Sequence, residues 1–137
     1  MIIAVDFDGT VVTHKFPYVG EDVGAADVLK NLVKNGHKLI LNTMRSHRPY
    51  EFPDGTSKDT LQEAIDWFES NSIELYGVNE NPSQKEWTDS PKIYANIYID
   101  DAALGCPKIM SKHGVPIVDW LTIDNWFKQV GIINTII

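Results

Sequence analysis

The sequence predicts a single α/β domain over residues 1–137, with a mainly parallel sheet, helices on both of its faces and hence three layers. Short apolar runs alternate along the chain with longer segments whose apolar residues recur at helical spacing, an order that favours a parallel sheet. The chain is long enough for one continuous hydrophobic core. It contains no internal repeat, low-complexity run or linker that would divide it.

The expected strands are short apolar runs that stop at polar or turn-forming residues. The first run, Ile2-Ile3-Ala4-Val5, ends at Asp6-Phe7-Asp8-Gly9, which is typical of a buried strand followed by a turn. The remaining strands are expected at residues 38–41, 73–76, 93–99 and 115–118.

Three helices are expected between and after these strands. Apolar residues at helical spacing predict the first over residues 22–35, with Gly36 where a C-cap belongs. Ser57 is expected to cap a second helix that ends at Asn71, and residues 121–130 are expected to form a terminal amphipathic helix. The polar stretch from Asn79 to Pro91 is expected to be a loop.

The composition limits which binding partners and which cellular compartment are expected for this chain. With 43% apolar and 23% charged residues the chain is expected to be globular, and its net charge of -7 disfavours a broad nucleic-acid or membrane surface. The single cysteine, Cys106, cannot form an internal disulfide, which fits a reducing compartment. Asp6 comes too early for a signal peptide and the tail 131–137 is too short to span a membrane, so we expect a cytoplasmic protein.

Acidic and hydroxyl residues follow several of the expected strands. In parallel α/β sheets the carboxyl ends of the strands meet at one edge, where ligands bind. The residues expected to converge there are Asp6, Asp8, Thr43, Asp100 and Asp101. Four carboxylates repel one another unless a cation compensates their charge, and hard oxygen ligands with few histidines point to Mg²⁺.

This edge has the groups needed for phosphoryl transfer. Asp6 could attack phosphorus to form an aspartyl phosphate, and Asp8, on the same side of the extended chain, could serve as general acid and base. Gly9 allows a sharp turn, which the hydroxyl of Thr10 could tie.

Two further groups are expected to contact the phosphoryl oxygens. Thr43 could donate a hydrogen bond to one of them, although it could equally close the end of its strand. A lysine should neutralise the spread negative charge; Lys92 is the first choice and Lys85 its rival, although Lys92 could also be an ordinary surface residue.

These residues resemble the motifs of the haloacid dehalogenase (HAD) superfamily. The first motif, an apolar strand followed by DxDGT, matches residues 2–10 throughout. The second, an apolar strand ending in Thr or Ser, resembles residues 39–43, and Lys92 stands for the third. The fourth, acids after an apolar strand, resembles residues 97–101, so the motifs follow in the order of the family.

The resemblance implies a Rossmannoid fold and a Mg²⁺-dependent phosphomonoesterase with Asp6 as nucleophile. The metal would bind the Asp6 carboxylate, the Asp8 backbone carbonyl and one acid of the Asp100-Asp101 pair, with Asp100 favoured. The intervals between motifs are too short for a separate domain, so a small capless hydrolase is expected. Its open site would suit a phosphorylated small molecule or a polymer-attached phosphate, with nucleic acid less favoured.

The loops 11–20 and 45–55 are the expected rims of this site. Arg45, with His47 and Arg48, could bind a distal anionic group of the substrate, or these side chains could form only a solvated face. At the tail, Ile132-Ile133 and Ile136-Ile137 could form a contact in a homo-oligomer.

Three alternatives stay open beside the hydrolase. The chain could be a HAD-like module that binds Mg²⁺ or a phosphate group without turnover, or a phosphotransferase that passes the phosphoryl group to an alcohol. A phosphoacceptor receiver domain has a similar size and acid cluster, but its phosphorylated aspartate follows the third strand, where this chain has none.

Overall fold

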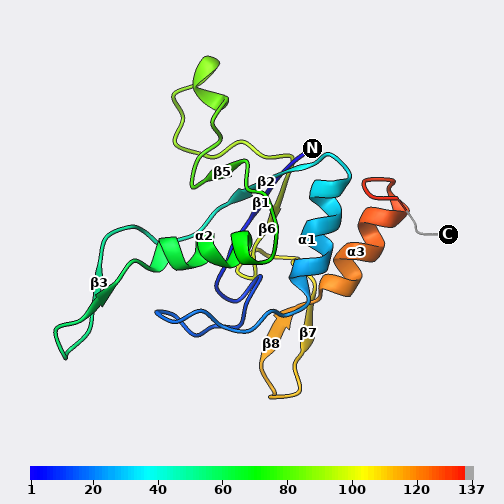
Figure 1. The fold of residues 1–137 in the computed structure, drawn as a ribbon. Coiled ribbons are helices and arrows are strands. Elements are labelled where there is room, and N and C mark those ends of the chain that lie inside the picture. The colour runs from blue at the N-terminus through cyan, green and yellow to red at the C-terminus, as the bar shows by residue number, and fades with distance from the viewer. Residues whose placement is uncertain (135–137) are drawn as a thin grey trace.

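The centre of the protein is a four-stranded, all-parallel sheet with the strand order β5-β2-β1-β6 (Figure 1). The computed structural model describes residues 1–134. The four strands are β1 (Ile2–Val5), β2 (Lys38–Leu41), β5 (Gly77–Val78) and β6 (Ile97–Ile99). In the register of the sheet, Val5 lies beside both Leu41 and Ile99, so β1, β2 and β6 end side by side. The predicted parallel α/β sheet is confirmed in this form.

The described residues form three α-helices: α1 (Ala25–Lys34), α2 (Thr60–Ser70) and α3 (Trp120–Gln129). Aspartates begin two of them: the Asp59 side chain accepts from the backbone N–H of Gln62, and the Asp119 side chain accepts from that of Thr122. Ser57, expected to cap the second helix, instead belongs to a short strand. Helices α1 and α3 lie against each other (Figure 1).

The α-helices pack on one face of the sheet. Ile3 and Leu39 belong to the main core together with buried residues of α1, α2 and α3, whereas Ala4 and Ile40 pack with Ala95 on the other face. Strand crossovers are right-handed. The steps from β1 to β2 and from β2 to β5 run in the same direction across the sheet, which puts α1 and α2 on one side.

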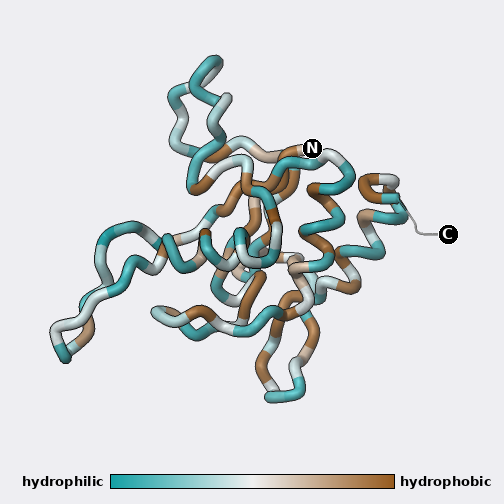
Figure 2. The backbone as a smooth tube through the Cα atoms, viewed as in Figure 1, coloured by the Kyte–Doolittle hydropathy of each residue, from teal (hydrophilic) through white to brown (hydrophobic). Residues whose placement is uncertain are grey.

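The second face is covered by an irregular connection. The step from β5 back to β6 reverses direction, so residues 79–96 cross the opposite face. This segment contains the 3₁₀-helix η1 (Gln84–Glu86), and among the described residues it carries no α-helix. The third layer therefore differs from the expected helical one. Figure 2 shows the central strands as mainly hydrophobic and the tip of this connection as mainly hydrophilic.

The predicted fifth strand does not join the parallel sheet. Residues 116–118 form β8 (Pro116–Val118), which pairs antiparallel with β7 (Lys108–Met110) in a separate hairpin. That expectation is wrong because the short connection from β7 allows a hairpin but no crossover. A second hairpin, of β3 (Tyr50–Glu51) and β4 (Ser57–Lys58), extends from the other side of the molecule (Figure 1).

The tail packs on its own chain rather than standing free. Ile133 is 1% exposed and belongs to the core, and Ile132 packs against it. Ile133 is therefore not available for the expected subunit contact, and Ile136-Ile137 lie outside the described residues. Over residues 1–134, no helix combines the length and the apolar character needed to cross a bilayer.

Candidate metal centre

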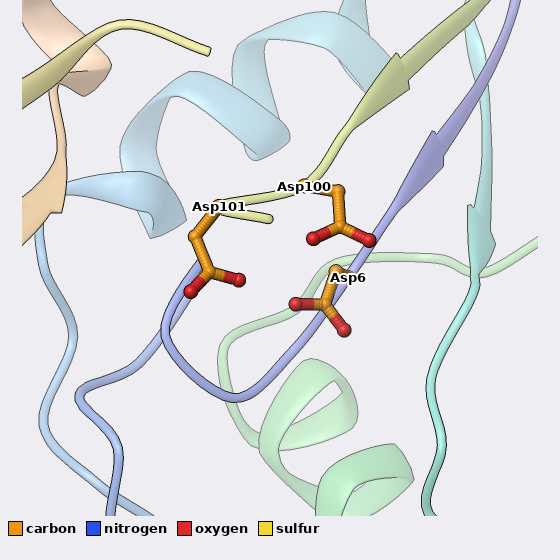
Figure 3. Close-up of side chains that lie close together, drawn as sticks. All are labelled: Asp6, Asp100 and Asp101. Atoms are coloured by element: carbon orange, nitrogen blue, oxygen red, sulfur yellow. The ribbon is translucent and has the colours of Figure 1, made fainter. Parts of the chain in front are cut away.

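Three carboxylates converge where β1 and β6 end. Asp6 follows β1, and Asp100 and Asp101 follow β6, the strand paired with it. One oxygen of each carboxylate lies within 4.8 Å of the others. Figure 3 shows the Asp6 and Asp100 side chains facing each other, with Asp101 on the adjacent turn. The structure thus brings Asp6 to the Asp100-Asp101 pair, 94 or more residues further along the chain, because neighbouring parallel strands end at the same edge of the sheet.

The Thr10 hydroxyl connects the two sides of this cluster. Its Oγ1 lies 2.9 Å from Asp6 Oδ2 and 3.1 Å from Asp101 Oδ1, and it accepts a hydrogen bond of 2.9 Å from the Asp101 backbone N–H. The Thr10 carbonyl accepts from the Trp120 indole N–H at 2.8 Å. Thr10 is fully buried. Its side chain therefore fixes the spacing of the acids as well as the turn.

Gly9 makes the turn between Asp6 and Thr10 possible. Its φ of +81° lies in the left-handed region, and a Cβ at this position would collide with the His14 imidazole and the Asp101 carboxylate. The turn is closed by the Phe7 carbonyl, which accepts from the backbone N–H of Thr10 at 3.1 Å. Glycine is therefore required here both by backbone conformation and by space.

The pKa values of Asp6 and Asp101 are shifted in opposite directions. Burial raises the pKa of Asp6 from 3.8 to about 7, the charge of Asp100 adds to this rise, and the Thr10 hydrogen bond opposes it. Partial burial acts to raise the pKa of Asp101 as well, but hydrogen bonds from His14, Asp6 and Thr10 together hold it below its usual value. Without a cation, Asp6 is therefore only partly ionised near neutral pH.

A hard divalent cation fits this donor set. The three carboxylates supply only oxygen ligands, which Mg²⁺, Mn²⁺ and Ca²⁺ prefer. Among the described residues the cluster has one basic contact, from His14 Nε2 to Asp101 Oδ2 at 3.0 Å. A bound cation would compensate the remaining negative charge and allow Asp6 to ionise.

Asp8 lies apart from the three acids and forms an ion pair with Arg45. Arg45 Nε donates to Asp8 Oδ2 and Nη2 to Asp8 Oδ1, both at 2.8 Å. The Arg45 side chain is 1% exposed and also donates to the carbonyls of Thr60 and Tyr18. The sequence suggested that Arg45 binds a distal group of the substrate, but these contacts indicate otherwise. Its guanidinium instead orients Asp8.

Thr43 follows β2 at the same edge of the sheet. Its Oγ1 accepts from the Arg45 backbone N–H at 3.1 Å, and its own backbone N–H donates to Asn79 Oδ1 at 2.8 Å. The Asn79 side chain also donates to the Arg45 carbonyl at 3.3 Å. Asn79 thus ties the end of β5 to the end of β2. The Thr43 hydroxyl hydrogen still has no protein acceptor among these contacts and can donate to a ligand.

The structure does not bring Lys92 to the acid cluster. Lys92 comes four residues before Asn96, whose side chain accepts from the Ile2 backbone N–H at the start of β1, opposite to Asp6. Lys92 Nζ lies 5.8 Å from the centroid of the Tyr98 ring. The expectation fails because the connection must return to the amino end of the sheet before β6 begins. Lys85 lies in η1, within the same connection, which extends to the top of Figure 1.

Sequence reasoning missed two residues of this region. The spacing of His14 matches no metal-ligand motif, so only the folded loop after β1 reveals its contact with Asp101. Asn79 lies in the expected loop 79–91, where no sequence pattern marks it; the expected strand at 73–76 is wrong, because the strand of the sheet is β5 at Gly77–Val78, which Asn79 directly follows. The side chains of Asp6, Thr10, Asp100 and Asp101 lie together as expected.

A solved structure of a conserved protein from Bacteroides thetaiotaomicron is similar to this chain. The two are 33% identical, the match covers 95% of this chain and 91% of the other, and the TM-score is 0.70. No protein-family model and no curated protein matches the sequence. The similarity extends over nearly the whole of both chains.

Proposed function

The chain belongs to the family of that conserved Bacteroides thetaiotaomicron protein, and we propose that it is a Mg²⁺-dependent phosphohydrolase of the HAD type. The observation that carries this proposal is the convergence of Asp6, Asp100 and Asp101 within 4.8 Å, directly after the two adjacent strands. The DxDGT sequence of residues 6–10 supports the assignment of the first of these acids as the nucleophile.

In this proposal Asp6 attacks the phosphorus of a phosphate monoester. A carboxylate oxygen of Asp6 forms a bond to phosphorus while the bond from phosphorus to the ester oxygen breaks, which leaves an aspartyl phosphate. Asp8 begins this cycle protonated; it gives that proton to the departing alcohol oxygen and regains one from the water that attacks the aspartyl phosphate, so that it ends as it began. Phosphate is released and the Asp6 carboxylate is restored.

The surrounding residues hold these two acids in place. Mg²⁺ on Asp6, Asp100 and Asp101 would neutralise the phosphate and polarise its phosphorus. Arg45 orients Asp8 through both of its carboxylate oxygens, each of which keeps a second acceptor position for the proton it moves. The Asp8 backbone carbonyl remains a proposed fourth ligand. Thr43 would donate its free hydroxyl hydrogen to a phosphoryl oxygen.

The site would be open rather than covered by a cap domain. Between Asp8 and Thr43 the chain forms one loop and α1, and between Thr43 and β6 it forms one short hairpin, α2, β5 and the irregular connection. These short elements leave room for a phosphorylated small molecule or a polymer-attached phosphate. A reducing compartment such as the cytoplasm suits the unpaired Cys106.

One observation favours a second candidate, a HAD-like module that binds Mg²⁺ and phosphate without turnover. The lysine that the resemblance implies lies away from the acids, whether it is Lys92 or Lys85. Phosphoryl transfer depends on electrostatic stabilisation, so the loss of one cation weakens catalysis more than it weakens metal binding. Arg45 and His14 are the basic groups that the described residues offer in its place.

The deciding experiment measures phosphate release from a panel of phosphate monoesters. It is run with Mg²⁺, with EDTA, and with Asp6→Asn in Mg²⁺; the hydrolase predicts release in the first condition alone. An added alcohol acceptor separates hydrolysis from transfer, since a transferase would yield phosphorylated alcohol in place of free phosphate. Mg²⁺ binding without release from any ester would overturn the hydrolase in favour of the binding module.

A further inference from the structure

A pocket lies next to Arg45, the ion-pair partner of Asp8. It has a volume of about 380 Å³, which is within the range of small-molecule sites. It lies between the loop that follows β1 and the segment that joins β2 to β3. Its walls include Phe16, Met44, Arg45, Arg48, Tyr50 and Glu51. We call these six residues the aromatic pocket.

The walls of the aromatic pocket combine polar and charged groups with two aromatic rings and a thioether that face solvent. Phe16 is 51%, Tyr50 38% and Met44 98% exposed. The Phe16 and Tyr50 rings meet edge to face with their centroids 5.5 Å apart, so the two are held in a fixed mutual orientation. Arg48 and Glu51 carry opposite charges, which disfavours a second phosphate and favours a group of low charge.

Arg45 connects this pocket to the proposed reaction. One guanidinium lines the pocket, lies 5.3 Å from the centroid of Phe16 and holds both oxygens of Asp8. Met44, at the mouth, directly follows Thr43, the proposed phosphoryl contact. The pocket therefore begins next to the acid that would protonate the leaving oxygen.

We propose that the aromatic pocket binds the leaving group of the phosphate ester and selects a planar aromatic one, such as a nucleobase or an aryl ring. This inference rests on the proposed function. A flat ring can stack on Tyr50 and contact Met44, whose flexible thioether adapts to aromatic edges. A bare sugar or an aliphatic chain presents no π-face and would gain less from the same walls.

Two pairs of esters test the inference because each pair differs only in the ring. Adenosine 5′-monophosphate is compared with ribose 5-phosphate, and benzyl phosphate with cyclohexylmethyl phosphate. Within each pair the alcohol that departs is nearly the same. The aromatic member should have a kcat/KM at least about tenfold higher, the effect expected from one stacked ring. A preference in the first pair alone identifies a nucleobase, and one in both identifies aromatic rings in general.

Variants of Tyr50 locate the preference. Tyr50→Ala should lower the ratio of the two kcat/KM values about tenfold, whereas Tyr50→Phe, which keeps the ring, should preserve it. Trp87→Ala is the matched control, because Trp87 is also an exposed aromatic residue, 64% exposed, but packs on Tyr94 outside the pocket. Ratios cancel any general loss of activity that a substitution causes.

Rate and binding measurements together separate a wrong aromatic pocket from a wrong proposed function. Equal kcat/KM values within both pairs, with phosphate release intact, would overturn the aromatic pocket and leave the hydrolase standing. If no ester is hydrolysed, equilibrium dialysis of the same four esters with Mg²⁺ decides. Tighter binding of the aromatic members that is lost in Tyr50→Ala supports the pocket, and equal binding overturns it.

Discussion

Arg45 holds Asp8 through two parallel hydrogen bonds of 2.8 Å, although the residues are 37 positions apart in the chain. The guanidinium lies between the Phe7 and Phe16 rings, 5.0 and 5.3 Å from their centroids. The pair is shielded from water on the arginine side, with side-chain exposures of 1% for Arg45 and 17% for Asp8. The charge on Asp8 thus depends on a single, buried partner.

Replacing Arg45 should therefore reduce both stability and activity. Arg45→Ala leaves Asp8 without its partner and should lower the free energy of unfolding by about 3 kcal/mol. Arg45→Lys keeps the charge but not the paired geometry, and should lower kcat by about tenfold or more. Urea denaturation and initial rates measure the two effects. Lys30→Arg, an equally conservative change at an exposed position of α1, is the control; an equal effect of the two variants would contradict this reading.

The acid cluster should bind Mg²⁺, with Asp100 as a stronger contributor than Asp101. Asp101 is engaged by Thr10 and His14, whereas the Asp100 carboxylate accepts from the Ala102 backbone N–H and retains more free lone pairs. Asp100→Asn should weaken Mg²⁺ binding by about 100-fold and Asp101→Asn by about tenfold. Isothermal titration calorimetry measures both. Asp89→Asn changes the same charge at an exposed site and should have no effect.

Mg²⁺ affinity should rise with pH because Asp6 must lose its proton to bind the cation. With the pKa of metal-free Asp6 at about 7, the ionised fraction grows roughly tenfold between about pH 6 and about pH 8, and the affinity should follow it. Titrations at the two pH values give the ratio. Affinities that do not change over this range would mean that Asp6 is not a ligand or is already ionised.

The raised pKa of Asp6 also predicts a pH-dependent cost to stability without metal. The folded state holds the Asp6 proton more tightly than the unfolded state, so the carboxylate costs nothing below its ordinary pKa of 3.8 and the full amount above about 7. Asp6→Asn removes this cost. After allowance for its partial exposure, the variant should be about 1–2 kcal/mol more stable than the parent above neutrality.

Urea denaturation in EDTA across this pH range measures that difference. It should shrink as the pH falls toward the ordinary pKa of the carboxyl group, since both proteins are then uncharged at position 6. A difference that stays constant with pH would argue that the substitution acts through packing rather than through ionisation.

Thr10 provides a test of the link between the two sides of the site. Thr10→Val keeps the shape but leaves the partly buried Asp101 backbone N–H without its acceptor, which should cost about 1 kcal/mol of stability or more. Because the Thr10 hydrogen bond lowers the pKa of Asp6, its removal should also weaken Mg²⁺ binding near neutral pH. Thr10→Ser retains the hydroxyl and should preserve metal binding. Equal affinities in the two variants would speak against the link.

Lys92 should not be needed for phosphate release. Its Nζ lies near the Tyr98 ring and its backbone near the start of β1, so Lys92→Met should change kcat/KM by less than about threefold, as expected for a surface change. Lys85→Met should likewise change kcat/KM by less than about threefold. A loss of 100-fold or so in either variant would show that the connection carries its lysine to the acids when substrate binds.

The sequence by itself determined the parallel order of the sheet and the place of its acids, although not the number and bounds of its strands. Alternation of strands and helices predicted parallel order, and parallel strands end at one edge, so Asp6, Asp100 and Asp101 had to meet. Gly9 and Thr10 were likewise assigned to the turn, because backbone freedom and a short hydroxyl side chain act locally. These features follow from local pattern and a general rule of topology.

Only the tertiary structure decided the partners of the charged side chains. Arg45 pairs with Asp8 because the loops after β1 and β2 lie side by side, and His14 pairs with Asp101 because the loop after β1 also meets the turn after β6. The reversal from β5 to β6 takes Lys92 to the opposite end of the sheet, although its spacing from Asp100 had suggested the site. Local pattern specifies an element, whereas the partner of a long side chain depends on which loops the finished fold brings together.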